Sequence, residues 1–385
     1  MTDDPPAHPA LLPSGFRDLL PEAAEEEAQA IATLMAVFAG HGYQRVKPPL
    51  LEFQEGLFAG SGAALAEQTF RLMDPLSQRM MGLRADITPQ VARIATTRLA
   101  AVPRPLRLSY AGQCVRVAGS ELAPERQIGQ AGIELVGEDS LAADTELLLV
   151  GAEALGAVGI GRVSVDLTLP TLVPALLEAA GLDAAARAPL ARALDRKDAA
   201  AVARHGGPLA GLLADLLLAA GPAARALAAL AAAALPDAAR ALAERLAATV
   251  AAVAARAPNL LLTVDPVEFR GLRYHTGLAF TFYAPGRRIE LGRGGRYLGN
   301  AGEPATGLTL YPDRILAAIP PLPARPRLFI PWGADPAQAA ARRAEGFATV
   351  AALSPHGPAA AEARRLLCTH YLEGGTNVPL APEHA

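Results

Sequence analysis

Charged and polar side chains that could bind a small zwitterion lie in three short segments. LRADITPQVAR contains Asp86 and Thr88, and the stretch from CVRV to RQIGQAGIELVG contains Arg116, Gln130 and Glu134. An arginine fork binds a carboxylate and a carboxylate binds an ammonium group, so Asp86, Arg116 and Glu134 have the signs that suit a free amino acid. The third segment, FRGLRYHTGLAF, adds Arg270, Tyr274 and His275.

Each of these residues also has a purely structural interpretation. The two arginines could form ion pairs with Glu134 or Asp86 and hold an inactive site together. Asp86 directly precedes a predicted helix and could cap it, which is compatible with a ligand contact. Gln130 and Glu134 are four apart, so they point to one side of a strand, but by themselves they could be surface residues. His275 could be a core histidine whose ring nitrogens are satisfied.

Familiar catalytic and cofactor motifs are missing from the sequence. It contains no P-loop, HExxH or GxSxG motif, and no GxGxxG between a strand and a helix. GRGGRYLG, at 292–299, leads to no periodic helix, so a structural turn is a better interpretation than a phosphate cradle. Cys114 and Cys368 lack CxxC spacing, which argues against a zinc site or a disulfide framework. We therefore expect neither a metal nor a cofactor.

Composition excludes several classes of protein. The apolar fraction of 51% is too high for a disordered chain. A net charge of −3, without a cluster of Lys and Arg, gives no basic surface for nucleic acid. The most apolar stretch, 209–235, is interrupted by Asp215 and Gly221-Pro222, so no membrane span is expected. The acidic, Pro-rich start has no features of a signal peptide, and the cytoplasm is the expected location.

Periodicity indicates which elements position the candidate residues. A helix should begin at Pro21, because Ile31, Leu34, Met35 and Phe38 then form one apolar stripe. Short strand-like runs fill 69–136, with one helix at about 89–99 among them, and further strands are expected at 162–169 and within 260–311. Many strands with few helices between them favour an α+β fold with a mainly antiparallel sheet.

The predicted organisation has four parts. Residues 1–12 should be disordered, and 13–170 with 258–318 should form the sheet core with flanking helices. Residues 171–257 are rich in Ala and Leu and broken by Gly and Pro, which predicts an inserted bundle of short helices. Residues 319–385 should form a Pro-rich linker and a short C-terminal α/β unit.

Several segments, in order along the chain, resemble histidyl-tRNA synthetase and other class II aminoacyl-tRNA synthetases. LLPSGFRDLLPEAA is similar to the entry segment of that family, and GYQRVKPPLLEF to motif 1. The run from RLSYAGQCVRV to RQIGQAGIELVG resembles motif 2, and GRGGRY with ATGLTLYPDRI resembles motif 3. FRGLRYHTGLAF resembles the segment peculiar to histidine-specific members, and LRADITPQVAR is nearest to the form in their regulatory paralogues. The resemblance implies a class II synthetase-like fold over about 11–170 and 258–318.

Departures from the synthetase pattern affect mainly the ATP site. Where the family places a Glu that receives the adenine amino group, this chain has Ala118, and an Arg of the next loop is replaced by Pro124. The Asp and the second Tyr of the RGLDYY segment are Arg273 and His275 here. The region after the core is also shorter than an anticodon-binding domain. This profile is similar to that of the regulatory subunits of ATP phosphoribosyltransferase, which implies a non-catalytic role at the first step of histidine biosynthesis.

The resemblance also implies a ligand, partners and contacts. Asp86 and Thr88 would face the ammonium group of free L-histidine and Arg116 its carboxylate, with Gln130 and Glu134 across the base. Arg270, Tyr274 and His275 would close the imidazole end, since both ring nitrogens need polar partners. The expected partners are a second copy of the chain, forming a homodimer core, and the short-form ATP phosphoribosyltransferase catalytic subunit. Two alternatives stay open: an active histidyl-tRNA synthetase, and a histidine-sensing module for another protein.

Overall fold

The computed structural model describes residues 11–119, 123–268, 274–284, 286, 289–321, 324–355 and 357–381. It divides into two compact units, Met1–Pro320 and Pro321–Ala385, which are described separately. Most of the predicted disordered segment 1–12 lies outside the described residues.

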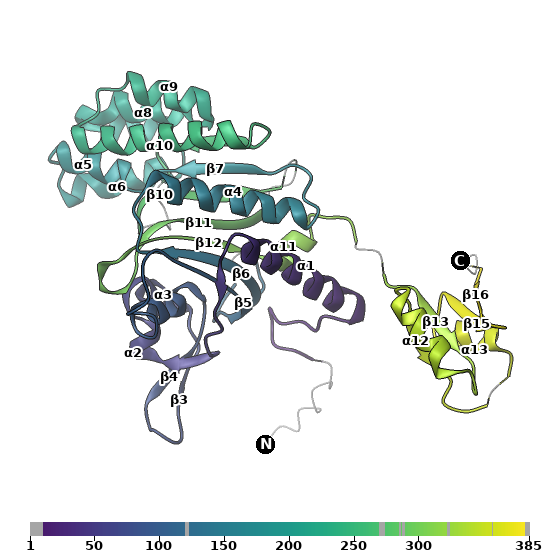
Figure 1. Cartoon of the computed structure of the whole chain (residues 1–385). Coiled ribbons are helices and arrows are strands. Elements are labelled where there is room, and N and C mark those ends of the chain that lie inside the picture. The colour runs from purple at the N-terminus through teal and green to yellow at the C-terminus, as the bar shows by residue number, and fades with distance from the viewer. Residues whose placement is uncertain are drawn as a thin grey trace, which may run out of the picture. The chain divides into compact units, whose positions relative to one another are not determined.

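A nine-stranded sheet forms the centre of the first unit (Figure 1). In spatial order its strands are β1 (Gln44–Arg45), β5 (Leu106–Val115), β6 (Gln127–Val136), β12 (Pro304–Leu310), β11 (Glu290–Leu298), β10 (His275–Tyr283), β7 (Ser164–Thr168), β9 (Leu261–Asp265) and β8 (Gly221–Pro222). The pairs β1–β5 and β7–β9 are parallel, and all other neighbours are antiparallel. The predicted mainly antiparallel α+β fold is confirmed.

Two long helices pack on each other beside the sheet. Helix α1 (Pro21–Gly40) begins at the predicted proline, and Leu34, Met35 and Phe38 of its apolar stripe are buried. Helix α4 (Leu141–Ala157) is capped by Ser140, whose side chain accepts a hydrogen bond from the amide of Ala143. Together with the short helix α11 (Pro312–Leu316), they lie along the same part of the sheet (Figure 1).

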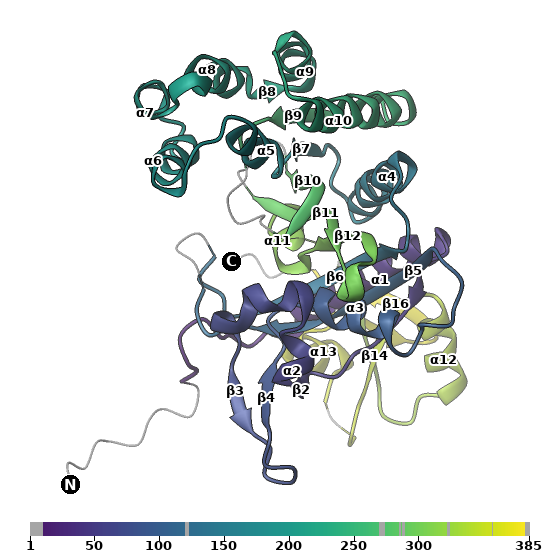
Figure 2. The same ribbon diagram turned by 90° about the vertical axis from the view of Figure 1, so that its left-hand side faces the viewer.

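A smaller layer packs, through helix α3 (Thr88–Thr96), on the face of β6 opposite to α1 and α4 (Figure 2). It also contains helix α2 (Gln54–Leu57), the 3₁₀ helix η1 (Gly60–Gln68), and a separate sheet of β2 (Leu51–Phe53), β4 (Met80–Leu83) and β3 (Arg71–Met73). The runs TFRLM and RMMGL are thus strands, as predicted, but they pair with each other outside the main sheet. Helix α3 packs on β6 and so carries its N-terminal residues to the main sheet.

The Ala-rich insertion forms six helices that cover the far strands of the sheet (Figure 2). They are α5 (Leu172–Ala179), α6 (Ala184–Asp195), α7 (Ala199–His205), α8 (Ala210–Ala219), α9 (Ala223–Ala232) and α10 (Asp237–Arg256). Between α8 and α9 the chain contributes β8 to the main sheet. Leu190, Leu216 and Leu246 of these helices share one hydrophobic cluster with Ile133 and Leu167 of the sheet. The insertion is therefore continuous with the core and does not form a separate apolar interior.

The second unit is a four-stranded sheet with one helix on each side. Its strand order is β14 (Ala348–Ala351), β13 (Arg327–Ile330), β15 (His370–Glu373) and β16 (Thr376–Pro379), of which only β16 runs antiparallel to its neighbour. Alternate residues of β13 face two apolar clusters: Leu328 packs with Ala339 of α12 (Pro336–Ala344), and Phe329 with Ala363 of α13 (Ala359–Arg365). The sequence prediction did not include β16.

Candidate ligand-binding pocket

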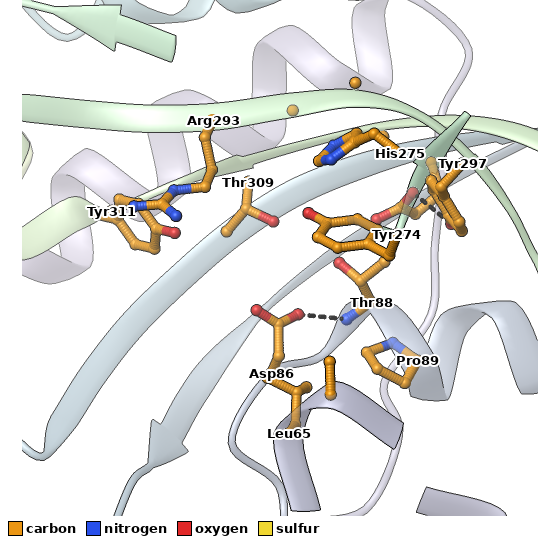
Figure 3. Close-up of a pocket in the computed structure, with 15 residues that line it drawn as sticks. Leu65, Asp86, Thr88, Pro89, Tyr274, His275, Arg293, Tyr297, Thr309 and Tyr311 are labelled. Atoms are coloured by element: carbon orange, nitrogen blue, oxygen red, sulfur yellow. Dashed lines mark hydrogen bonds between the residues drawn. The ribbon is translucent and has the colours of Figure 1, made fainter. Parts of the chain in front are cut away.

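A pocket opens between the central sheet and the start of α3 (Figure 3). Strands β6, β12 and β11 form its floor, and Asp86 and Thr88 approach from the opposite side. Tyr274 and His275, at the start of β10, form a further wall. The hollow between these residues amounts to about 610 Å³, a volume that includes space open to solvent.

Glycines in the floor make room for the polar groups. Glu134 pairs with Gly307 across β6 and β12, and Gly307 pairs with Gly295 across β12 and β11. A Cβ atom on Gly307 would lie 2.0 Å from a carboxylate oxygen of Glu134, and one on Gly295 would lie 2.5 Å from the His275 ring. The absence of side chains at these two positions therefore lets Glu134 and His275 occupy the same hollow.

Glu134 is buried, and no cation among the described residues forms an ion pair with it. Its side chain accepts hydrogen bonds from the hydroxyls of Tyr297 at 2.8 Å and Tyr110 at 3.4 Å. Burial raises the pKa of Glu134 to about 8, although the hydrogen bonds that it accepts from neighbouring hydroxyl groups lower this pKa. Gln130 and Glu134 are 0% and 1% exposed, so the interpretation of these two residues as surface groups is wrong. Glu134 is a neutral or weakly ionised hydrogen-bonding group at the bottom of the pocket.

Asp86 is held by hydrogen bonds to both of its oxygens. Oδ1 accepts from the amide of Thr88 at 2.9 Å, and Oδ2 accepts from the side-chain amide of Gln130 at 2.8 Å. The Gln130 oxygen in turn accepts from the amide of Ile87 at 3.0 Å. Asp86 thus accepts a hydrogen bond from the first residue of α3, but the N-cap position of that helix is Ile87, so Asp86 is not its cap; its side chain lines the pocket. Gln130 does not face the pocket but fixes the orientation of Asp86.

Two aromatic side chains enclose another side of the pocket. The rings of Tyr274 and His275 are 4.0 Å apart between centroids and tilted by 35°. His275 is only 4% exposed, whereas Tyr274 is 40% exposed and stands at the mouth. His275 is therefore a buried residue that also faces the pocket. Arg270, predicted for this same end, lies outside the described residues.

Arg116 lies outside the lining of the pocket. It follows the last residue of β5, and its Nε donates to the carbonyl of Ala85 at 3.4 Å. In the described part of the chain, Arg116 forms no ion pair with Asp86 or Glu134, so the ion-pair interpretation does not hold for this arginine. Its assignment to a ligand carboxylate stays a prediction.

Motif 3 supplies lining residues that the sequence reasoning did not assign to the site. Arg293, Tyr297, Thr309 and Tyr311 all line the pocket. The sequence did contain a pattern that could have assigned Arg293 and Tyr297 to the site: if ELGRGGRYL is a strand, alternation places residues 293, 295 and 297 on one face. Interpreting GRGGRYLG as a turn was wrong: the segment forms most of β11, and Gly294 and Gly295 sit in the pocket floor.

Three charged groups form a cluster at the Arg293 side of the pocket. The Glu290 carboxylate receives both Nε and Nη2 of Arg293, the latter at 2.7 Å, and Nη1 of Arg314 at 2.8 Å. The Arg314 guanidinium also lies over the Tyr311 ring, 4.4 Å from its centroid. Arg314, from the PDRI segment that resembles motif 3, is thus held in a structural ion pair. Two cations share one anion here, which leaves a net charge of +1.

In the described residues, no group of three or more His, Cys, Asp or Glu side chains is placed to hold a metal ion. Over that same part of the chain, no helix is both long enough and apolar enough to cross a membrane.

Comparisons with known proteins show the family and the fold of this chain. The profile of the histidyl-tRNA synthetase family matches residues 15–315. An ATP phosphoribosyltransferase regulatory subunit of Paramagnetospirillum magneticum is 58% identical over 95% of this chain and 97% of its own length. Among solved structures, an ATP phosphoribosyltransferase regulatory subunit/histidyl-tRNA synthetase from Bacillus halodurans has a TM-score of 0.78 at 22% identity, covering 92% of this chain and 96% of that one. A chain of an ATP phosphoribosyl transferase complex from Thermotoga maritima has a TM-score of 0.59 at 19% identity, covering 74% and 97%. This chain therefore belongs to the ATP phosphoribosyltransferase regulatory subunits, a family built on the fold of histidyl-tRNA synthetase.

Proposed function

We propose that this regulatory subunit binds free L-histidine in the pocket on β6, β11 and β12 and transmits that binding to the short-form catalytic subunit of ATP phosphoribosyltransferase. It would thereby support the first step of histidine biosynthesis and place it under feedback control. The observation that carries the proposal is the arrangement of Asp86 and Glu134, which line one pocket in a chain that belongs to this family.

The pocket chemistry matches histidine at two points. The oriented Asp86 carboxylate, with Thr88 beside it, suits an ammonium group. Glu134 and His275 offer polar partners for the ring nitrogens of an imidazole, and the Tyr274 ring provides an apolar surface beside them. These contacts come from three separate segments, so a ligand bound here would bridge α3, β6 and β10.

Loss of synthetase activity is part of the same proposal. Amino-acid activation needs ATP positioned for in-line attack, which requires a docked adenine and several phosphate contacts. Ala118 and Pro124 stand where the synthetase family uses polar groups, and Arg314 is held by Glu290. Each lost oriented contact costs about 3 kcal/mol of transition-state stabilisation. Histidine-dependent pyrophosphate exchange should therefore be undetectable, and a signal above background would support the alternative of an active synthetase.

Regulation requires only a modest difference in histidine affinity between two states of the complex. A coupling of about 1–3 kcal/mol changes affinity roughly 5- to 150-fold, which is enough for feedback. The test is calorimetric titration of histidine into the chain alone and into its complex with the catalytic subunit, together with catalytic assays at several histidine concentrations.

Asp86→Asn is the informative variant for this test. It keeps the shape of the side chain and an oxygen for the amide of Thr88 but removes the charge that would bind the ammonium group. Asp74→Asn, in the exposed turn between β3 and β4, is the matched control. Asp86→Asn should weaken both histidine binding and feedback, while the control should change neither. If neither the chain nor the complex takes up histidine, the proposed function is wrong.

A further inference from the structure

The charge cluster of Glu290, Arg293 and Arg314 leaves one positive charge at the edge of the pocket. Glu290 is mostly buried and is shared by both arginines. Arg314 holds its guanidinium over the Tyr311 ring, whereas the Arg293 side chain is 45% exposed and lines the pocket. Arg293 is therefore the member of the cluster that a soluble anion can reach.

Arg293 also has unused hydrogen-bond donors. The Glu290 carboxylate accepts hydrogen bonds from Nε and Nη2 of Arg293, so it binds the side edge of the guanidinium group. Among the described residues, Nη1 makes no hydrogen bond. A guanidinium carries five N–H groups in a planar fork, so its outer edge, formed by Nη1 and Nη2, can bind a second carboxylate in bidentate fashion. Glu290 can stay in place when that happens, because Arg314 shares its charge.

The position of Arg293 fits the α-carboxylate of a bound amino acid. Arg293 pairs with Thr309, so these two side chains lie next to each other on the floor. The hydroxyl of Thr309 is hydrogen-bonded to the hydroxyl of Tyr110 at 2.7 Å, and the Tyr110 hydroxyl is hydrogen-bonded to that of Thr88 at 3.1 Å. This chain of hydroxyl groups connects the Arg293 side of the floor with the Asp86 side of the pocket. Figure 3 shows Arg293 and Tyr311 on one side of the hollow, His275 and Tyr297 on the other, and Asp86 opposite the floor.

This layout separates the two ends of a ligand. On β11, Arg293 and Tyr297 point to the same face four residues apart, which corresponds to roughly 13 Å of strand. Tyr297 belongs to the Glu134 end, where the imidazole is proposed to bind. An α-amino acid oriented in this way directs its ammonium group to Asp86 and its carboxylate to the opposite end of the floor. Among the described residues that line the pocket, Arg293 is the cation at that end, and Arg116 is not part of that lining.

We propose that Arg293, and not Arg116, binds the carboxylate of the amino acid and so makes the site specific for free amino acids over amines. This inference rests on the proposed function of the pocket. It assigns the carboxylate contact to motif 3 on β11, in place of the motif 2 arginine at the end of β5.

The test compares L-histidine with L-histidinol, which keeps the ammonium and imidazole groups but has an alcohol in place of the carboxylate. Calorimetry on the full chain should show that the parent binds histidine at least 10-fold more tightly than histidinol. Arg293→Met should reduce histidine affinity about 10- to 100-fold and leave histidinol affinity the same or higher, so the preference disappears. Arg293→Lys, which keeps the charge but loses the fork, should retain part of the preference.

Arg116→Met and Arg270→Met are the comparison variants, and both should keep the preference for histidine. The inference is overturned if either of them abolishes the preference while Arg293→Met keeps it, or if Arg293→Met weakens both ligands equally. A parent protein that binds both ligands with equal affinity overturns the inference but leaves the proposed histidine pocket intact. A parent that binds neither ligand overturns both. The ratio measured on the parent does not depend on how well any variant folds.

Discussion

Replacing Glu134 with Gln should change how the stability of this protein depends on pH. Gln has the shape of the protonated acid and keeps an acceptor for the hydroxyl of Tyr297, but it cannot ionise. The side chain is 1% exposed, and burial raises its pKa from 4.5 to about 8. The folded state therefore binds the Glu134 proton more tightly than the unfolded state does.

The sign and size of the effect follow from proton linkage. Because the folded pKa lies above the unfolded value, the contribution to stability is fully present below pH 4.5 and is lost as the pH rises towards 8. Each pH unit in this window corresponds to about 1.4 kcal/mol, so the full window corresponds to about 5 kcal/mol. Between about pH 5 and pH 7, the Gln variant should gain about 3 kcal/mol relative to the parent. That is a large part of the stability of a typical domain.

Urea unfolding of both proteins at a series of pH values measures this difference. Far-UV circular dichroism is the suitable probe, because the single tryptophan, Trp332, lies in the unit Pro321–Ala385 and would not report on the pocket. Glu67→Gln, at an exposed position, is the control and should give a stability curve parallel to that of the parent. If the curves of the parent and of Glu134→Gln also run parallel from about pH 5 to pH 8, Glu134 is not the buried, proton-binding acid described above.

Three further outcomes are expected. Gly307→Ala places a methyl group where the Glu134 carboxylate lies, so histidine binding should be lost and urea unfolding should show a destabilisation of about 1–3 kcal/mol; unchanged binding would contradict the close packing of the floor. Asp144→Ala removes the buried partner of Arg296 and should cost about 3 kcal/mol or more, whereas a loss of less than about 1 kcal/mol would show that this ion pair does not hold β11 to α4. The open edge of the sheet at β1 should be covered in a homodimer, and sedimentation of the isolated chain as a monomer at micromolar concentration would count against this.

Features that depend on neighbours in the sequence were predictable from the sequence. The spacing of Leu34, Met35 and Phe38 determines the buried face of α1, because three and four residues complete a helical turn. The order of the synthetase-like segments predicted the fold, whereas the altered nucleotide site inferred from Ala118 stays a prediction. Alternation along a strand also placed Gln130 and Glu134 on one face, although it did not show whether that face was buried.

The tertiary structure decided which side chains share the pocket and what their charges become. Arg116 and Arg293 are equally plausible carboxylate ligands by residue type, but one follows the end of β5 and the other lies on the inner face of β11. The pKa of Glu134 depends on packing against β11 and β12, more than 150 residues away in the chain. Desolvation is a property of everything that surrounds a group, and most of what surrounds Glu134 is contributed by segments that are distant in sequence.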